Sequence, residues 1–395
     1  MMAQICLLNA EIYTGESIIE SGYVLIEDEK IKEVGMMEDY QEQSGFERVI
    51  DLKHAAKAVP GFIDLHIHGA HGADVMDATE EALQTMTSKL PFEGTTSFLA
   101  TTMTSSKEQI SKALVNTAGY LKEKNQTGAE ILGIHLEGPF LNPKRAGAQA
   151  PGNIIEPSVE LFDRWHEESG GSIKLVTLAA EREGGYELAS HLKSLSIVPS
   201  IGHSDAVYQE VETAVASGVH HATHLFNGMR GIHHRDAGTA GAVLMKDEVM
   251  TEMIVDGIHI APEMVKFAYR MKGSERAILI TDAMRAKGLG PGTYDLGGQE
   301  VTVDGERATL ADGTLAGSIL TFRDAAVNMM SFTGCSLLDA VTMSSVNPAK
   351  QIGVYDRKGS LEKGKDADIA VLDDELNVMM TICRGTISFT GSADK

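Results

Sequence analysis

The stretch GFIDLHIHG, residues 61–69, is an apolar run that closes on two histidines separated by a single residue. Side chains alternate between the two faces of a β-strand, so residues i and i+2 lie on the same face. His66 and His68 therefore share a face where this strand ends. Because histidine is the commonest metal ligand near neutral pH, the pair predicts either part of a metal site or two hydrogen-bonded structural histidines.

Seven further short apolar runs follow this stretch, and segments of helical periodicity separate most of them. Segments such as SKEQISKALVNTAGYLKE carry apolar residues at i, i+3 and i+4, which is typical of amphipathic helices. Apolar strands that alternate with helices predict a parallel sheet covered on both faces. Eight such units between residues 60 and 335 favour an α/β fold of the (β/α)8 TIM-barrel type, for which about 250 residues is usual. The seven runs are TSFLATT (96–102), ILGIHLEG (131–138), IKLVTLA (173–179), IVPSIGHS (197–204), VHHATHLF (219–226), EMIVDGIHI (252–260) and AILITDAM (277–284).

The two ends of the chain have a different pattern. Residues 1–58 and 350–395 consist of short strand-like runs and turns, and neither end can close a core alone. We therefore predict that they pair into one small β-sandwich domain beside the barrel. The barrel domain would span residues 59–349, with a β-hairpin excursion near 291–315.

The composition limits the classes of partner. The 395 residues carry a formal net charge of −22, which disfavours nucleic acid and anionic membranes as partners. The three cysteines, Cys6, Cys335 and Cys383, are too far apart for a CxxC metal site and too few for a disulfide framework. No apolar stretch reaches about 18 uncharged residues, and no basic segment precedes the first apolar run. We predict a cytoplasmic protein that binds neither nucleic acid nor membrane.

Chemically capable side chains recur where the predicted strands end, which is where barrel enzymes carry their active sites. Each of these residues alone could be structural, but their shared position favours one functional site. Neutral imidazoles and a carboxylate are suitable ligands for a metal that keeps open positions for water. We expect His135 and His220 to face away from the site, and His221 to face the barrel interior beyond the reach of a metal. The strand-end residues are His66 and His68 on the first strand, Glu137 on the third, His203 on the fifth, His224 on the sixth, His259 on the seventh and Asp282 on the eighth.

These segments resemble the amidohydrolase superfamily, and within it the deacetylases of phosphorylated amino sugars. The resemblance implies hydrolysis of the acetamide of N-acetyl-D-glucosamine 6-phosphate to D-glucosamine 6-phosphate and acetate, in amino-sugar catabolism. It also implies a homodimer whose small-molecule partner is that phosphorylated amino sugar. The segments that carry it span nearly the whole chain in the family's order: PGFIDLHIHG, GIHLEGPFLNPKRAGA, IGHSDA, ATHLFNGM, DGIHI, ITDAM, TLAGS and the tail from NPAKQIGV to KGSLEKGKDADIAVLD.

The same resemblance implies a role for each site residue. Glu137, His203 and His224 would hold a catalytic divalent cation, zinc or iron, and His66 and His68 would help to hold a second. Asp282 would be the general acid and base. Many relatives carry a histidine where Gln149 stands, so the role of Gln149 is open. Substrate contacts would come from Ala148, Asn227, Gly228, Arg235, His259, Leu315, Ala316 and Gly317, with Arg235 at the phosphate and His259 at the acetamide carbonyl.

Two other functions share part of this pattern. Another amidohydrolase, such as a cyclic amidase or a dipeptidase, often bridges two metals with a carboxylated lysine, but no lysine ends a predicted strand. A non-catalytic barrel relative should have lost metal ligands, and this chain retains all of them. The metal content and the reaction with the phosphorylated sugar distinguish these alternatives.

Overall fold

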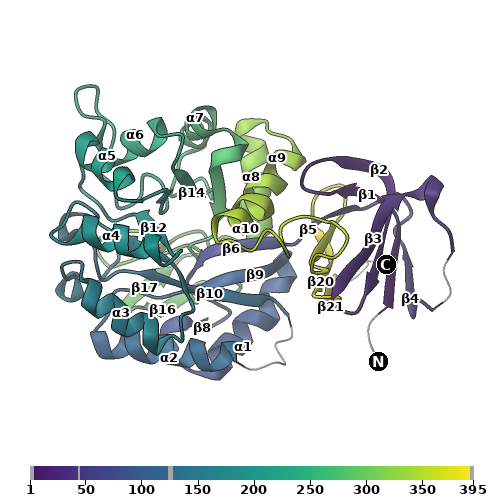
Figure 1. The fold of residues 1–395 in the computed structure, drawn as a ribbon, viewed down its shortest axis with the longest axis horizontal. Coiled ribbons are helices and arrows are strands. Elements are labelled where there is room, and N and C mark those ends of the chain that lie inside the picture. Colours follow the sequence, from purple (N-terminus) through teal and green to yellow (C-terminus); the bar gives the residue numbers. More distant parts are fainter. Residues whose placement is uncertain (1–3, 43–44, 123–127, 392–395) are drawn as a thin grey trace.

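A parallel eight-stranded sheet forms the larger part of the molecule (Figure 1). The computed structural model describes residues 4–42, 45–122 and 128–391. Neighbouring strands of the sheet follow one another in chain order, so each connection crosses over through a helical segment. The predicted TIM-type barrel is confirmed. Its strands are β6 (Phe62–Ile67), β9 (Thr95–Thr101), β10 (Glu130–Glu137), β11 (Ile173–Leu178), β12 (Val198–Ile201), β13 (His221–Ala222), β14 (Met250–Ile254) and β15 (Ala277–Ile280).

Residues at the ends of the first and last strands close the barrel. The backbone N–H groups of His68 and Gly69 donate to the carbonyl of Ala283 at 2.9 and 3.0 Å. The N–H of Asp282 donates to the carbonyl of His66 at 2.8 Å. The closure therefore brings Asp282 beside His66 and His68.

Amphipathic helices cover the outside of the sheet, and side-chain caps mark where several of them begin. The hydroxyls of Thr79, Ser106 and Ser158 accept a hydrogen bond from a backbone N–H in the first turn of α1, α2 and α3. These helices turn one apolar face to the strands and the opposite face to solvent. The helices are α1 (Glu80–Lys89), α2 (Lys107–Leu121), α3 (Val159–Glu168), α4 (Gly185–Ser194), α5 (Tyr208–Ala216), α6 (Gly238–Met245), α7 (Pro262–Lys272), α8 (Phe322–Thr333), α9 (Leu337–Val341), a π-helix (Thr342–Val346) and α10 (Asn347–Gln351).

Strands from both ends of the chain form a second, mixed sheet, drawn in purple and yellow beside the barrel in Figure 1. Strand β5 joins the two ends, because it pairs with β1 in parallel and with β19 antiparallel. The two ends thus pair with each other beside the barrel, as predicted, and they do so in one mixed sheet where a β-sandwich was expected. The domain boundaries at 58/59 and 349/350 stay a prediction. The strands are β1 (Gln4–Tyr13), β2 (Ile18–Glu27), β3 (Lys30–Met36), β4 (Arg48–Asp51), β5 (Lys57–Pro60), β19 (Ile369–Leu372), β20 (Val378–Cys383) and β21 (Thr386–Thr390).

Two small antiparallel sheets lie near the mouth of the barrel. One contains β7 (Gly69–Ala70) and β8 (Ala73–Asp74). The other falls within the predicted excursion near 291–315 and contains β16 (Gly292–Leu296), β17 (Gln299–Val303) and β18 (Ala308–Thr309). Apolar residues of this second sheet pack against methionines at the ends of barrel strands, which fixes it over the barrel mouth. Among the helices in the described ranges, none is long and apolar enough to cross a membrane.

A buried group of charges ties the mixed sheet to the barrel. Lys358 is 1% exposed, and its Nζ contacts Glu130 Oε2 at 2.7 Å, Asp366 Oδ2 at 3.2 Å and the carboxylate of Asp368. Glu130 begins β10 of the barrel, and the two aspartates precede β19 of the mixed sheet. Burial lowers the pKa of Lys358, but the surrounding carboxylates outweigh it and raise the pKa overall. The ammonium is therefore charged and compensates several buried acids at once.

We expect Lys358→Met to lower the free energy of unfolding by about 3–5 kcal/mol, the usual cost of removing one partner from a buried ion pair. Methionine keeps the volume but leaves Asp368 and Glu130 without this cation. Urea denaturation followed by circular dichroism measures the change. Lys363→Met, at an exposed lysine of the same segment, is the matched control. Equal stability of the two variants would contradict a bracing role for this cluster.

Candidate active site

Three predicted site residues stand at the same position relative to their strands. His203, His224 and Asp282 each lie two residues beyond the last residue of β12, β13 and β15. All three have a left-handed backbone, with φ of 47°, 32° and 47°. This conformation is uncommon outside glycine and costs about 1–3 kcal/mol per residue, so it persists where the surrounding structure enforces it. Each strand thus ends in a turn that fixes the backbone of one site residue.

A buried carboxylate lies at the centre of the barrel mouth. The Oε1 atom of Glu137 is 3.0 Å from His224 Nε2 and 3.3 Å from His203 Nε2. These two nitrogens are 3.1 Å from one another. Two imidazole nitrogens and a carboxylate oxygen that converge in this way require a shared proton or a cation between them. The first predicted ligand group is therefore assembled in space.

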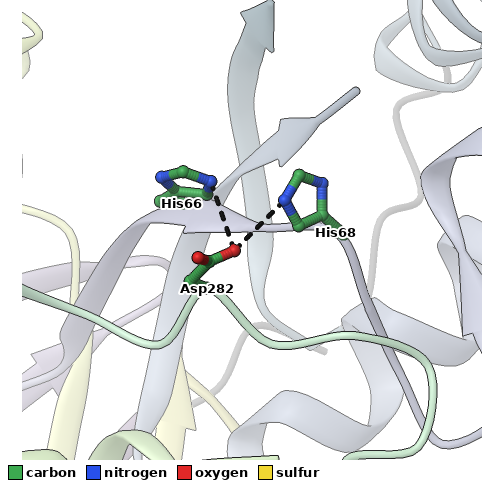
Figure 2. A group of neighbouring side chains, drawn as sticks. All are labelled: His66, His68 and Asp282. Atoms are coloured by element: carbon green, nitrogen blue, oxygen red, sulfur yellow. Dashed lines mark ion pairs between the residues drawn. The ribbon is translucent and has the colours of Figure 1, made fainter. Parts of the chain in front are cut away.

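The second group contains His66, His68 and Asp282 (Figure 2). Asp282 Oδ1 is 3.4 Å from His66 Nε2 and 3.2 Å from His68 Nε2. Glu137 borders this group too, since its Oε2 is 3.3 Å from His68 Nε2 and its Oε1 is 3.6 Å from His66 Nε2. One carboxylate therefore stands between the two groups, with Oε1 shared between the first group and His66, and Oε2 toward His68.

Acceptors behind the histidines orient their rings. His203 Nδ1 is 2.8 Å from the carbonyl of Arg145, His68 Nδ1 is 3.3 Å from the carbonyl of Thr101, and His66 Nδ1 is 3.1 Å from Glu252 Oε2. An acceptor at Nδ1 holds the proton there and leaves the lone pair of Nε2 directed at the centre. Within the described chain, the buried Nε2 of His66 has no hydrogen-bond partner. A divalent cation would satisfy that nitrogen, and the nitrogen and oxygen donors suit one.

Glu252 is a site residue that was not predicted from the sequence. This carboxylate is fully buried on β14, where its Oε1 lies 2.9 Å from His221 Nε2 and its Oε2 accepts the backbone N–H of His224 at 3.1 Å. Together with the His66 contact, it links three strands beneath the site. Burial raises its pKa, but the hydrogen bonds from His221 and His66 outweigh this and hold the pKa well below its usual range. An acid within the apolar run EMIVD was the available signal, because a buried carboxylate needs partners.

The prediction for His135 was wrong. Its ring is buried and stands edge-on to His66 at 4.6 Å between ring centres, and its Nε2 lies 2.7 Å from Thr177 Oγ1. His135 precedes Glu137 by two residues on β10, so strand alternation places both on the interior face. Burial lowers the pKa of His135 well below its usual range, so this imidazole is neutral. His221 faces the interior as expected.

The remaining predicted residues divide into two sets around a cavity of about 250 Å³ at the barrel mouth. Arg235 and Ala316 do not line it. The Arg235 guanidinium is exposed and lies 2.6 Å from His234 Nε2, whereas Ala316 is buried beneath the cavity wall. The lining includes the ligand candidates His68, Glu137, His203, His224 and Asp282, the predicted contacts Ala148, Asn227, Gly228, His259, Leu315 and Gly317, and also Met103, Gly147, Gln149, Leu296 and Thr314.

Asp256 fixes His259, and sequence reasoning missed this partner too. The Nδ1 of His259 is 2.6 Å from Asp256 Oδ2, and Asp256 Oδ1 accepts the backbone N–H groups of Ile258 and His259. Burial raises the pKa of Asp256, but these hydrogen bonds outweigh it and lower the pKa. The carboxylate holds the ring while His259 lines the cavity.

The charges of the site keep its two carboxylates ionised. Burial raises the pKa of Glu137, but the neighbouring His66, His203 and His224 outweigh it and hold the pKa well below its usual range. Burial likewise raises the pKa of Asp282, and His66 and His68 lower it by more. Both groups are therefore carboxylates at neutral pH, able to bind a cation or accept a proton.

Residues 58–388 match the model of the amidohydrolase family. An N-acetylglucosamine-6-phosphate deacetylase from Bacillus subtilis is 48% identical over 392 residues, covering 98% of both chains. A variant of the Mycobacterium smegmatis deacetylase, solved in complex with N-acetyl-D-glucosamine-6-phosphate, is 31% identical with a TM-score of 0.91, covering 98% of this chain and 100% of its own. The Thermotoga maritima deacetylase is 36% identical with a TM-score of 0.87 and the same coverage.

We expect Glu137→Gln to lose most of the divalent metal that the wild-type chain binds. An amide cannot supply the negative charge that a carboxylate offers to a divalent cation. Elemental analysis of the purified variant measures the metal, and circular dichroism confirms its fold. A folded variant with full metal content would contradict the ligand role of Glu137.

Proposed function

The chain belongs to the amidohydrolase family, and we propose that it hydrolyses the acetamide of N-acetyl-D-glucosamine 6-phosphate to D-glucosamine 6-phosphate and acetate. The observation that carries the proposal is that Glu137, Asp282 and three ligand histidines line one cavity at the carboxyl ends of the barrel strands, with the fourth, His66, 3.4 Å from Asp282. The 48% identity to a deacetylase over nearly the full chain supports the substrate. No lysine stands among the described residues of the cavity lining, which disfavours a carboxylated-lysine amidohydrolase.

Metal binding is the first requirement of this proposal. Glu137, His203 and His224 would hold one divalent cation, zinc or iron, and His66 and His68 would hold a second with Asp282 nearby. Such a cation supplies a water of lowered pKa and polarises the acetamide carbonyl. The backing contacts at Nδ1 keep the histidine Nε2 atoms available for this purpose.

Asp282 is the proposed general acid and base. Its carboxylate is ionised and lines the cavity, so Oδ1 or Oδ2 can accept the proton of the attacking water. The same carboxyl then returns this proton to the departing amine nitrogen, because an amine leaves readily only when it is protonated. The turn beyond β15 and the hydrogen bond from the N–H of Asp282 to the carbonyl of His66 hold the residue in place.

His259 is the proposed contact of the acetamide carbonyl. Asp256 accepts from the Nδ1 of its ring, so the opposite nitrogen can donate to the carbonyl oxygen, where negative charge develops, when the imidazole carries a proton on both nitrogens. The backbone of the loop at Asn227 and Gly228, together with Ala148, Leu315 and Gly317, would enclose the sugar. Ala316, buried behind this wall, would act through the backbone of its neighbours.

Arg235 remains the proposed phosphate ligand, although it does not line the cavity of its own chain. A guanidinium offers paired donors that match phosphate oxygens, and it stays charged at any working pH. His233 and His234 lie beside it, so local positive charge is available on a strongly acidic protein. We further propose that the protein is a homodimer and that it is cytoplasmic.

The direct test measures acetate release from N-acetyl-D-glucosamine 6-phosphate, with unphosphorylated N-acetylglucosamine as the comparison substrate. The metal-loaded chain should turn over the phosphorylated sugar with the higher kcat/KM, and prior chelation should abolish that reaction. The absence of acetate release from a fully metal-loaded chain would contradict the proposal. The 6-phosphate of N-acetylgalactosamine, tested in parallel, measures the selectivity at the sugar ring.

For Asp282→Asn we expect kcat to fall at least ~10²-fold, the scale of a lost acid and base, while most of the metal is retained. The amide keeps the shape of the side chain but cannot carry the proton from water to amine. Steady-state kinetics and elemental analysis on the same preparation separate the two effects. Near-normal turnover would remove Asp282 from the reaction, and complete metal loss would make it a ligand instead.

For Arg235→Ala we expect a steep rise in KM for the phosphorylated sugar and little change in the slower reaction of the unphosphorylated sugar. The removed guanidinium would contact only the phosphate, so the second substrate is the internal control. Kinetics with both substrates provide the measurement. Equal losses on both would show that Arg235 supports the loop and does not contact the phosphate.

A further inference from the structure

Besides the histidines, the side chain of Gln149 contacts the Glu137 carboxylate. Its Nε2 donates to Glu137 Oε2 at 2.8 Å, and its Oε1 accepts the backbone N–H of Thr104 at 2.8 Å. The side chain is 4% exposed, in the wall of the cavity. Gln149 lies in the loop beyond β10, and its side chain contacts Thr104 in the segment that follows β9.

The two partners fix the orientation of this amide. A backbone N–H can only donate, so the amide oxygen must face Thr104. An ionised carboxylate can only accept, so the NH₂ group must face Glu137. The second N–H points toward Met103 Sδ at 3.7 Å. Most of the hydrogen-bonding capacity of Gln149 is therefore directed at the protein rather than at a substrate.

The loop that carries Gln149 is itself held on both sides. The N–H of Gln149 donates to the carbonyl of Ala146 at 2.9 Å, and Gln299 Nε2 donates to the carbonyl of Ala148 at 2.5 Å. Gln299 belongs to β17 of the sheet over the barrel mouth. The amide thus approaches Glu137 from a fixed backbone.

The contact determines how Glu137 divides its two oxygens. A free carboxylate can rotate and direct both oxygens to the same histidine pair. Here Oε2 is held by Gln149 on the side of His68, which leaves Oε1 toward His203 and His224. His66 Nε2 borders Oε1 too, at the longer distance of 3.6 Å. A carboxylate has about four acceptor positions, so Oε2 can receive the N–H and still bind a cation.

We propose that Gln149 is a positioning residue, whose amide holds Oε2 of Glu137 toward His68 and leaves Oε1 toward His203 and His224, so that the chain holds two metal ions. The inference rests on the proposed metal-dependent function. It extends that function, because a residue that is not itself a metal ligand would control whether the second ion binds.

The test uses Gln149→Leu, which keeps a similar volume and removes both amide contacts. Wild-type and variant chains are loaded with Zn²⁺, and bound metal is measured by elemental analysis and by competition with a chromophoric chelator. We expect two ions per wild-type chain. In Gln149→Leu we expect the second ion to bind about 10–100-fold more weakly, the usual loss when a partner behind a ligand is removed. The double variant His66→Ala with His68→Ala gives the reference value for one ion.

Gln299→Leu is the matched control, because it removes a hydrogen bond to the same loop without touching Glu137. It should keep two ions with wild-type affinity. Thermal unfolding of the metal-free proteins should give similar midpoints for the two glutamine variants, so that a change in metal binding cannot come from unfolding.

Three outcomes overturn the inference. The first is a second-ion affinity in Gln149→Leu within twofold of wild type, and the second is an equal loss in Gln299→Leu. The third is a single ion in the wild-type chain. A wild-type chain that binds no metal contradicts the proposed function itself, so the two failures are distinguishable. A raised KM that accompanies the first outcome would make Gln149 a substrate contact.

Discussion

The site depends on one constraint, which is the burial of the Glu137 carboxylate. A buried charge is costly unless opposite charges and hydrogen-bond donors surround it. Four histidine Nε2 atoms and the Gln149 amide lie within 3.6 Å of its two oxygens. Positive charge at the barrel mouth would stabilise this buried carboxylate. A divalent cation supplies that charge while the imidazoles stay neutral.

The fold supplies these partners because the barrel closes on itself. Closure through the backbone of His66, His68 and Ala283 joins the first strand to the last and places Asp282 against the histidine pair. The left-handed turns beyond β12, β13 and β15 then set the backbone of three site residues. Beneath them, Glu252 connects three strands through His66, His221 and the backbone of His224. The strained turns are thus held by an interior that is polar and hydrogen-bonded.

Some polar residues of the site line the cavity, and others support the residues that do. Asp282, His68, His203 and His224 line the cavity, whereas Glu252 and Asp256 act through the rings that they hold. Gln149 shares features of both groups, since it lines the cavity and its amide hydrogen-bonds to Thr104 and Glu137. In metal sites generally, such supporting contacts orient the ligands and tune the affinity for the cation.

The sequence by itself determined the eight strands, their order and most of the residues at their ends, because hydrophobic periodicity and strand alternation are local properties. His259 is the exception, since it lies five residues beyond the end of β14. Alternation alone also places His135 on the same face of β10 as Glu137. The sequence could not give the partners of Glu252, Asp256 or Gln149, or the position of Arg235 outside the cavity. His66 and Glu252 come from opposite parts of the chain, and only barrel closure brings their side chains to 3.1 Å. Tertiary structure therefore decided which atoms meet, since a side-chain contact depends on how distant segments pack and no local pattern encodes that distance.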